Sequence, residues 1–394
     1  MRKRIPVSDL QFGMYIAELD RPWTDTPFVF QGFVLSTPQQ LEALKKYCAT
    51  VVINTAREDA PAEARARPAA GGTAYPEKAS VEQELAPAQA AYADSRILMH
   101  EVLSTVRVGG TLDAEQVRSA VTAMTESVLR NPEALLLLSQ LRKHGEYEES
   151  HALDVSIYMI TFGRFLGLDP ARIEFLGYLG LLQDVGKLRL PKDLLKKRGL
   201  LTAEELALAR QHVAHTVDIL GATAGLPPEL ARAAGLHHER YDGSGYPAAL
   251  RGAQIGLTGS IAAIADTYDA LTVQRPHADP LSPSAAISLL YKSRGGLFDP
   301  QLVEQFIRCI GIFPVGSLVQ LNTGETGVVI GQHPLKRLQP RVMVVRDAAG
   351  NPMHPQKLLD LSRSPKASTS EPYRILGTLE AGSVPFNPEE LFLR

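Results

Sequence analysis

The sequence contains few of the residues that a disulfide-stabilised or cysteine-ligated protein needs. Its 394 residues include two cysteines, Cys48 and Cys309, which lie far apart and form no CxxC pair. A disulfide framework is therefore excluded, and a structural zinc site built on cysteine pairs is not expected. This cysteine usage is typical of a reducing compartment, so we expect a cytoplasmic protein.

Long apolar runs and a strong charge imbalance are also missing. Apolar stretches such as 134–138 are far too short to cross a bilayer, so we expect no membrane span. The basic start MRKRIP is followed by polar SDLQFG, which argues against a signal peptide. The formal net charge is −2, so the composition gives no indication of a nucleic-acid partner.

The first part of the chain falls into three segments of different composition. Residues 1–55 contain short β-branched and aromatic runs broken by Gly, Pro and Asp, which predict a β-rich module with one helix near 38–48. Residues 56–94 are rich in Ala, Pro, Glu and Arg, which predicts a flexible linker. Helical periodicity over 95–144 predicts a helical connector, which either packs against the next domain or forms a homodimer contact.

The remainder also divides into three segments. Residues 145–310 have helical patterning almost throughout, which predicts the main domain. Residues 311–363 alternate with the strand period around Gly-containing turns and predict a small β appendage. Residues 364–394 are expected to form a tail. The predicted fold class is therefore mainly α, a helical bundle with small β-rich modules at both ends.

One stretch of the helical domain, HHERYDGSGYP at 237–247, combines residue types that rarely occur together by chance. A helix that starts after Pro228 carries His237 and His238 in its last turn, and the Asp-Gly-Ser-Gly sequence ends it. Adjacent helical residues point about 100° apart, so both imidazoles can approach one centre only where the helix ends. Histidines in such a place suit a metal ion better than a hydrophobic core.

Further ligand-type residues lie elsewhere in the same domain. Six of the ten histidines fall between 151 and 277, and IAAIADTYD contains aspartates that are costly to bury unless they are paired or metal-bound. Carboxylates mixed with imidazoles suit a pair of divalent cations such as Mn²⁺ or Fe²⁺, which can activate water against a phosphoester. Lys187, one turn after Asp184, offers positive charge to a substrate phosphate. The candidate ligands are His151, Asp184, His212, His237, His238, Asp266 and Asp269.

Four motifs in the same order resemble the HD-GYP domain, a bacterial subgroup of the HD phosphohydrolase superfamily. They are LLQDVGKLRLP at 181–191, HHERYDGSGYP at 237–247, ADTYDALTVQRP at 265–276 and FDPQLV at 298–303. The resemblance covers 145–310, and residues 1–55 with the linker resemble the uncharacterised module that often precedes such domains. It implies an HD-type helical bundle that hydrolyses cyclic di-GMP to linear pGpG and then GMP at two or three iron or manganese ions.

Carried over position by position, the resemblance implies roles for individual residues. The implied metal ligands are His151, Asp184, His212, His237, His238 and Asp266. Lys187 and Arg275 match residues that contact substrate phosphate, and Asp184 with Lys187 would act in catalysis. The implied signature loop, linked to cyclic-dinucleotide binding and to contacts with diguanylate cyclase (GGDEF) domains, consists of Asp242, Gly243, Gly245, Tyr246 and Pro247.

The chain also departs from the family pattern. Gln183 replaces the histidine of the His-Asp pair, and an amide oxygen is a weaker ligand for a transition metal than an imidazole. Two metal positions are therefore expected, one of them impaired, with His215 as a candidate substitute ligand. Tyr147 stands where trinuclear members have a glutamate, which argues against a third ion, and Ala278 replaces a basic residue that would contact phosphate.

These features leave three functions open. The first is a metal-dependent cyclic di-GMP phosphodiesterase whose activity is reduced by Gln183. The second is a degenerate member that binds cyclic di-GMP or a diguanylate cyclase without turnover, which Gln183 and Ala278 favour. The third keeps the phosphohydrolase chemistry but acts on another nucleotide, and the signature loop argues against it.

Overall fold

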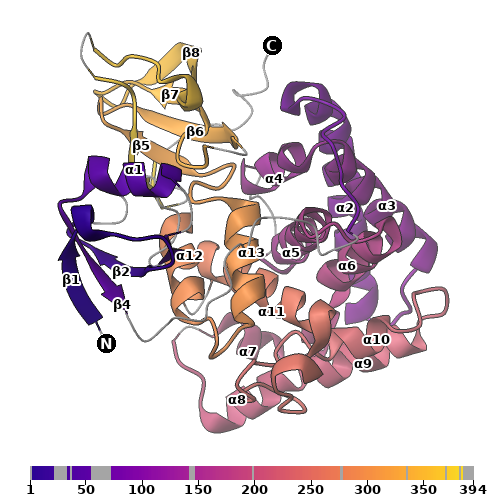
Figure 1. The fold of residues 1–394 in the computed structure, drawn as a ribbon. Coiled ribbons are helices and arrows are strands. Elements are labelled where there is room, and N and C mark those ends of the chain that lie inside the picture. The colour runs from indigo at the N-terminus through magenta and orange to yellow at the C-terminus, as the bar shows by residue number, and fades with distance from the viewer. Residues whose placement is uncertain are drawn as a thin grey trace. The chain divides into compact units, whose positions relative to one another are not determined.

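The structure is a computed structural model that describes most of the chain. The described residues are 2–21, 33–35, 38–54, 72–141, 147–197, 199–275, 278–333, 336–368, 371–380 and 383–384. The chain divides into two compact units, Met1–Arg67 and Pro68–Arg394. Figure 1 shows the elements of both units.

The amino-terminal unit is a small antiparallel sheet with one helix. Its elements are β1 (Arg2–Pro6), η1 (Val7–Asp9), β2 (Tyr15–Leu19), β3 (Phe33–Val34), α1 (Pro38–Tyr47) and β4 (Thr50–Asn54). The strands lie in the order β1-β4-β2-β3. The side chains of Ile16, Leu44 and Val51 meet in its core. The β-rich character and the single helix agree with the sequence expectation.

The second unit is predominantly helical, as predicted. Its helices are α2 (Val81–Arg107), α3 (Ala114–Arg130), α4 (Pro132–Leu141), α5 (Tyr147–Phe165), α6 (Pro170–Leu182), α7 (Lys192–Lys196), α8 (Ala203–Arg210), α9 (His212–Ala222), α10 (Leu230–Ala234), α11 (Gly256–Thr272), α12 (Pro283–Lys292) and α13 (Pro300–Ile310), with the short turns η3 (Val185–Arg189) and η4 (Gly252–Gln254). Several helices begin at side-chain caps: Asp169 caps α6, and Thr202 with Glu205 forms a capping box for α8.

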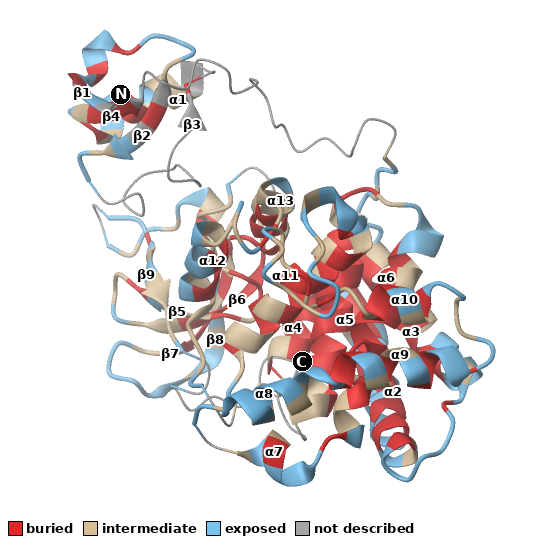
Figure 2. Ribbon diagram, turned by 90° about the horizontal axis from the view of Figure 1, so that it is seen from below, coloured by how far each residue is buried: buried red, intermediate tan, exposed pale blue. Residues whose placement is uncertain are grey.

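Helix α5 occupies the centre of this unit. Residues 151–163 of α5 are all buried, so every face of this part of the helix packs against other elements. It packs against α4, α6 and α11, and Figure 2 shows buried residues concentrated along these elements. The first turns of α5 and the last turn of α6 therefore have fixed positions, and both lead into the candidate site.

A five-stranded antiparallel sheet follows the helices. It comprises β5 (Leu318–Leu321), β6 (Thr326–Gly331), β7 (Arg341–Arg346), β8 (Pro352–Asp360) and β9 (Ile375–Thr378), in the order β8-β7-β6-β5-β9, with η5 (Leu361–Arg363) after β8. Val319, Val329 and Val344 lie in its core. This sheet confirms the β appendage that the alternating pattern predicted.

Two boundaries differ from the sequence expectation. Helix α2 begins at Val81, inside the stretch 56–94 that we expected to be a linker, because a Ser80–Gln83 capping box starts it and one face is buried despite Pro87. Strand β9 lies in the expected tail 364–394, where it pairs with β5. Among the described residues, no helix is both long and apolar enough to span a bilayer.

Glu133 joins the sheet to the helices and gives a testable pH dependence. Its Oε1 atom accepts a hydrogen bond from the Gln332 backbone N–H at 2.6 Å, and Arg341 Nη2 lies 3.9 Å from Oε2. Burial raises the pKa of Glu133 from 4.5 to about 7, although both partners favour the charged form. The folded state therefore retains a proton that the unfolded chain loses, and this contribution to stability is present below pH 4.5 and lost as the pH rises through 7.

We predict that Glu133→Gln removes this pH dependence. At pH 8 the variant should exceed the wild type in free energy of unfolding by about 1–3 kcal/mol, and the difference should vanish near pH 4.5. Denaturant unfolding of the full chain between pH 4.5 and 8 measures it. Glu126→Gln, which changes an exposed glutamate of α3, is the control and should leave the pH profile unchanged. An identical pH profile for Glu133→Gln and wild type would contradict the assignment.

Candidate metal centre

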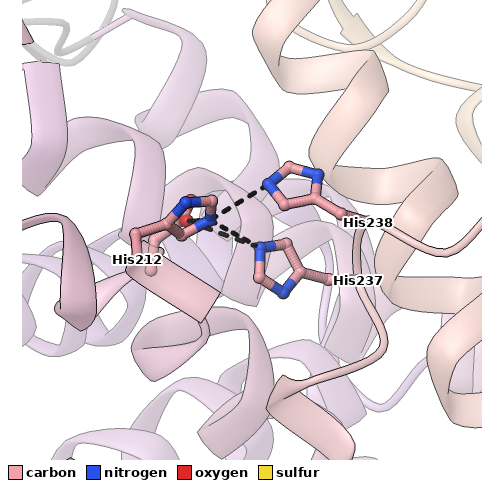
Figure 3. Close-up of side chains that lie close together, drawn as sticks. His212, His237 and His238 are labelled. Carbon is pink, nitrogen blue, oxygen red and sulfur yellow. Dashed lines mark hydrogen bonds and ion pairs between the residues drawn. The ribbon is translucent and has the colours of Figure 1, made fainter. Parts of the chain in front are cut away.

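Three structural elements carry the first group of ligand-type side chains. Asp184 follows α6 directly, His212 begins α9, and His237 and His238 lie in the turn after α10. One ligand atom from each of these four residues lies within 4.8 Å of the others. Figure 3 shows the imidazole of His212 facing those of the adjacent residues His237 and His238. We refer to these four residues as the triple-histidine cluster.

Backbone carbonyls determine where the protons of two imidazoles lie. His212 Nδ1 is 2.7 Å from the Ala209 oxygen, and His237 Nδ1 is 2.7 Å from the Ala234 oxygen. A carbonyl oxygen can only accept, so each Nδ1 must carry the proton and each neutral ring has its lone pair on Nε2. The tautomers are therefore those that a metal-ligating histidine requires.

The lone pairs of the triple-histidine cluster face one another. His212 Nε2 lies 3.4 Å from His237 Nε2, 3.1 Å from His238 Nε2 and 3.3 Å from Asp184 Oδ1. Asp184 Oδ1 is buried and has no hydrogen-bond partner among the described residues. The Nε2 lone pairs of neutral His212 and His237 and the Asp184 Oδ1 atom are acceptors at close range that repel one another, and a cation at their centre would satisfy all of them. These residues therefore fit a divalent metal ion.

Burial keeps His212 and His238 in the neutral form that binds metal. Burial lowers the pKa of His212 to about 4 and lowers the pKa of His238 well below its usual value. Burial also opposes the charge of Asp184, but Lys187, with its Nζ 2.8 Å from Oδ2, and the hydrogen bond from His151 hold the pKa of Asp184 well below its usual range. At neutral pH the cluster therefore offers two uncharged imidazoles beside a carboxylate.

The other oxygen of Asp184 belongs to a second group, which we call the His151 cluster: His151, Asp184 and Asp266. His151 Nε2 lies 3.1 Å from Asp184 Oδ2 and 3.1 Å from Asp266 Oδ1. Burial disfavours a charged His151 ring, but Tyr147 and the carboxylates outweigh it and raise the pKa of His151 well above its usual value. Asp184 thus contributes one carboxylate oxygen to each cluster.

Asp269 has a role that the sequence did not reveal. Its Oδ2 atom accepts a hydrogen bond from His151 Nδ1 at 2.6 Å, and its side chain is fully buried. This contact places the His151 proton on Nδ1 and directs Nε2 toward Asp184 and Asp266. Asp269 follows Asp266 by three residues on α11, so the i, i+3 spacing in an apolar helix was the available signal.

Gln183 lies at the His151 cluster, which is where the substitution was expected to matter. Its Nε2 atom is 3.5 Å from Asp266 Oδ1, and its buried Oε1 atom has no hydrogen-bond partner among the described residues. His215, the candidate substitute ligand, belongs to neither cluster of described residues. Tyr147 stacks on the His151 ring, with a centroid distance of 5.3 Å and an interplanar angle of 16°.

A recess beside His151 extends the site toward α2. Its wall includes Met99 and Leu103 from α2, together with Tyr147, Asp184 and Lys187. Helix α2 also packs against η3, the turn that carries Lys187. The sequence had placed residues 95–144 outside the catalytic domain, but α2 lines the site because its buried face packs directly on η3.

The residues of the signature loop lie in different positions relative to the clusters. Tyr246 stacks on His238, with a centroid distance of 4.7 Å and an interplanar angle of 26°. Asp242 is exposed, and its Oδ1 atom accepts hydrogen bonds from the backbone N–H and the hydroxyl of Ser244. Gly243 has a φ of 80°, and Pro247 follows a cis peptide bond. Asp242 and Gly243 therefore shape the turn, while Tyr246 contacts a residue of the triple-histidine cluster.

Buried Glu239 anchors this loop, which is a second role that the sequence did not reveal. Its two carboxylate oxygens accept hydrogen bonds from the backbone N–H groups of Ala248 at 2.7 Å and Leu250 at 2.9 Å. A side chain at Gly245 would overlap the backbone of Glu239 and Arg240, so only glycine allows this close return of the loop.

Arg275 lies three residues beyond the end of α11. Its backbone pairs with Ala278, and its Nε atom is buried without a hydrogen-bond partner among the described residues. This donor is therefore unused among the described residues, but it is closed to solvent.

Comparison with known proteins agrees with this geometry. A model described as "HD domain" matches residues 131–302, one described as "Domain of unknown function (DUF3391)" matches 2–117, and a "KOW domain associated with HD domain" matches 318–368. The cyclic di-GMP phosphodiesterase PA4108 of Pseudomonas aeruginosa is 34% identical over 92% of this chain and 90% of that protein. The chain belongs to the HD-GYP family.

Two further relatives match a shorter part of the chain. The cyclic di-GMP phosphodiesterase response regulator RpfG of Xanthomonas campestris pv. campestris is 37% identical over 36% of this chain and 38% of that protein. The 3'3'-cGAMP-specific phosphodiesterase 2 of Vibrio cholerae is 36% identical over 39% of this chain and 30% of that protein. HD-domain phosphohydrolases depend on metal ions, which agrees with the two clusters.

Gly186 provides a test of how the metal centre is assembled. A side chain there would overlap the His212 carbonyl oxygen and the backbone of Thr216, so only glycine lets η3 pack against α9. We predict that Gly186→Ala separates Asp184 from His212 and weakens Mn²⁺ binding by about 10- to 100-fold. Calorimetric titration of the metal-free protein measures the affinity.

The matched control is Gly221→Ala in α9, where an added methyl group has no neighbour within 4 Å. This variant should bind Mn²⁺ like the wild type. Equal affinities for Gly186→Ala and Gly221→Ala would show that the contact between η3 and α9 does not set the metal centre.

Proposed function

We propose that this protein is a metal-dependent phosphodiesterase that hydrolyses cyclic di-GMP to pGpG and then to GMP. One observation carries the proposal: Asp184 presents Oδ1 to the triple-histidine cluster and Oδ2 to the His151 cluster, so two adjacent cations would share one carboxylate. This is the donor arrangement that two-metal hydrolysis of a phosphodiester requires. The names of PA4108 and RpfG support cyclic di-GMP as the substrate.

The residues of the chain have distinct parts in this reaction. His212, His237, His238 and Asp184 would hold one ion, and His151, Asp184 and Asp266 would hold the other, with Gln183 as a weak or absent ligand. The bound ions, iron or manganese, would supply Lewis-acid activation of a phosphoryl oxygen and of the attacking water. Water adds to phosphorus, the bond to the ribose 3' oxygen breaks, and the proton passes to the leaving oxygen.

Positive side chains complement these clusters. Lys187 is held beside Asp184, and this proximity raises its pKa above the usual value although burial opposes the charge. It therefore remains an ammonium that can contact a phosphate oxygen. Arg275 is proposed to contact the same substrate through its guanidinium group. We propose that the signature loop, from Asp242 to Pro247, lines the mouth of the pocket.

Gln183 favours a second candidate function, which is cyclic di-GMP binding without turnover. The amide contributes no imidazole lone pair, and its N–H donor is the atom nearest Asp266. An ion at the His151 cluster would then have His151, Asp184 and Asp266 as its protein ligands, which reduces its occupancy. The expected contacts with diguanylate cyclase domains and the expected homodimer remain predictions.

The decisive test is hydrolysis by protein loaded with Mn²⁺ or Fe²⁺ under anaerobic conditions. We predict that the wild type converts cyclic di-GMP to pGpG and GMP slowly and that Gln183→His raises kcat/KM at least about tenfold, which corresponds to 1.4 kcal/mol of barrier. Asp184→Asn should abolish turnover, since it removes the shared carboxylate. Chromatography of the products measures all three proteins, and 3'3'-cGAMP serves as the competing substrate.

Gln301→His, at an exposed glutamine in the first turn of α13, is the matched control for an added histidine and should behave like the wild type. If neither the wild type nor Gln183→His forms products, hydrolysis is ruled out as the function. If the protein nevertheless binds cyclic di-GMP, the second candidate function, binding without turnover, is supported.

A further inference from the structure

An uncommitted cation lies beside the triple-histidine cluster. Arg210 ends helix α8, two residues before His212, and is exposed to solvent. Its guanidinium carbon lies 4.7 Å from the centre of the Tyr246 ring. No motif pointed to this residue, and neither cluster uses it.

Ring contacts connect Arg210 to the metal centre. The guanidinium contacts the face of Tyr246, and Tyr246 in turn stacks on His238, whose Nε2 atom belongs to the triple-histidine cluster. Cation–π contacts of this kind fix the plane of a guanidinium group without using its N–H donors. Arg210 is therefore held at the edge of the site in a defined orientation.

The support beneath Arg210 is rigid. The backbone N–H of Tyr246 donates to the His238 carbonyl oxygen at 3.2 Å, and buried Glu239 holds the continuation of the loop through Ala248 and Leu250. Gly245 lets this loop return against the backbone of Glu239. Tyr246 is thus a preformed platform.

The N–H donors of the Arg210 guanidinium differ from the donors of nearby cations, which already make hydrogen bonds within the protein. Lys187 donates to Asp184, and Arg240 donates to the carbonyl oxygens of His237 and Glu239. In the described part of the chain, no oxygen accepts a hydrogen bond from the Arg210 side chain. A fixed guanidinium with free edge donors suits bidentate contact with a phosphate.

We propose that Arg210 binds the second phosphate of a cyclic dinucleotide, the phosphate that is not being hydrolysed. This inference rests on the proposed function. A cyclic dinucleotide carries two phosphodiester groups on opposite sides of one ring, and the metal clusters with Lys187 can engage one of them at a time. The other phosphate lies outside the clusters, and Arg210 is placed to bind it on the Tyr246 side of the site.

The test compares a ligand that has two phosphates with one that has a single phosphate. Equilibrium dialysis of the Mn²⁺-loaded full chain measures the affinity for cyclic di-GMP and for GMP, with chromatography to detect turnover. We expect Arg210→Gln to weaken cyclic di-GMP binding by about tenfold or more, as loss of a charge-assisted hydrogen bond predicts. GMP binding should change less than about threefold, because the metal centre holds its one phosphate. Arg210→Lys should lie between Arg210→Gln and the wild type for cyclic di-GMP.

Arg172→Gln is the matched control, because Arg172 is an exposed arginine in the first turn of α6, at the end remote from Asp184. It should bind both nucleotides like the wild type. Unchanged cyclic di-GMP affinity in Arg210→Gln, or an equal loss for both nucleotides, overturns the role of Arg210 while the proposed function stands. A wild-type protein that binds neither nucleotide overturns both.

Discussion

The metal centre depends on electrostatic repulsion between groups that the helical unit holds close together. Three imidazoles and one carboxylate oxygen point at a common centre, and carbonyl oxygens of Ala209 and Ala234 fix two of the rings with their lone pairs inward. Among the described residues, Asp184 Oδ1 has no hydrogen-bond partner, and the Nε2 atoms of His212 and His237 lie within 3.5 Å of it, so the arrangement is unfavourable until a cation occupies the centre. The fold therefore brings these groups together at a cost that metal binding offsets.

Packing around α5 makes this arrangement possible. Because residues 151–163 of α5 are all buried, its contacts with α6 and α11 bring together His151 of α5, Asp184 after α6 and Asp266 of α11. The turn η3 then reaches α9 only because Gly186 has no side chain. Helix α2, which begins in the segment matched by the module of unknown function, packs on the same turn. The catalytic recess thus includes a wall from outside the segment that the HD-domain model matches.

Much of the candidate site could be predicted from the sequence, because motif order and residue chemistry identify ligands without coordinates. His151, Asp184, His212, His237, His238 and Asp266 converge as expected. Roles that depend on how close two side chains lie in the folded protein were not predicted from the sequence. Asp269 orients His151, Glu239 anchors the loop, and Arg210 contacts Tyr246, and each of these contacts joins residues whose side chains meet only in the folded chain. Composition also led us to predict a linker where α2 begins. The alanines and glutamates of this segment are common in linkers, but they favour a helix as well.

The metal content of the protein tests the central claim most directly. Full-length protein purified without oxygen, and the double variant His212→Ala/His237→Ala, are analysed for iron and manganese by mass spectrometry. The account predicts at least one ion per chain in the wild type and almost none in the double variant. When the metal of the wild type is removed with a chelator and Mn²⁺ is then added, the chain should bind an ion again. A wild-type chain that carries no ion and cannot be loaded with one would contradict it.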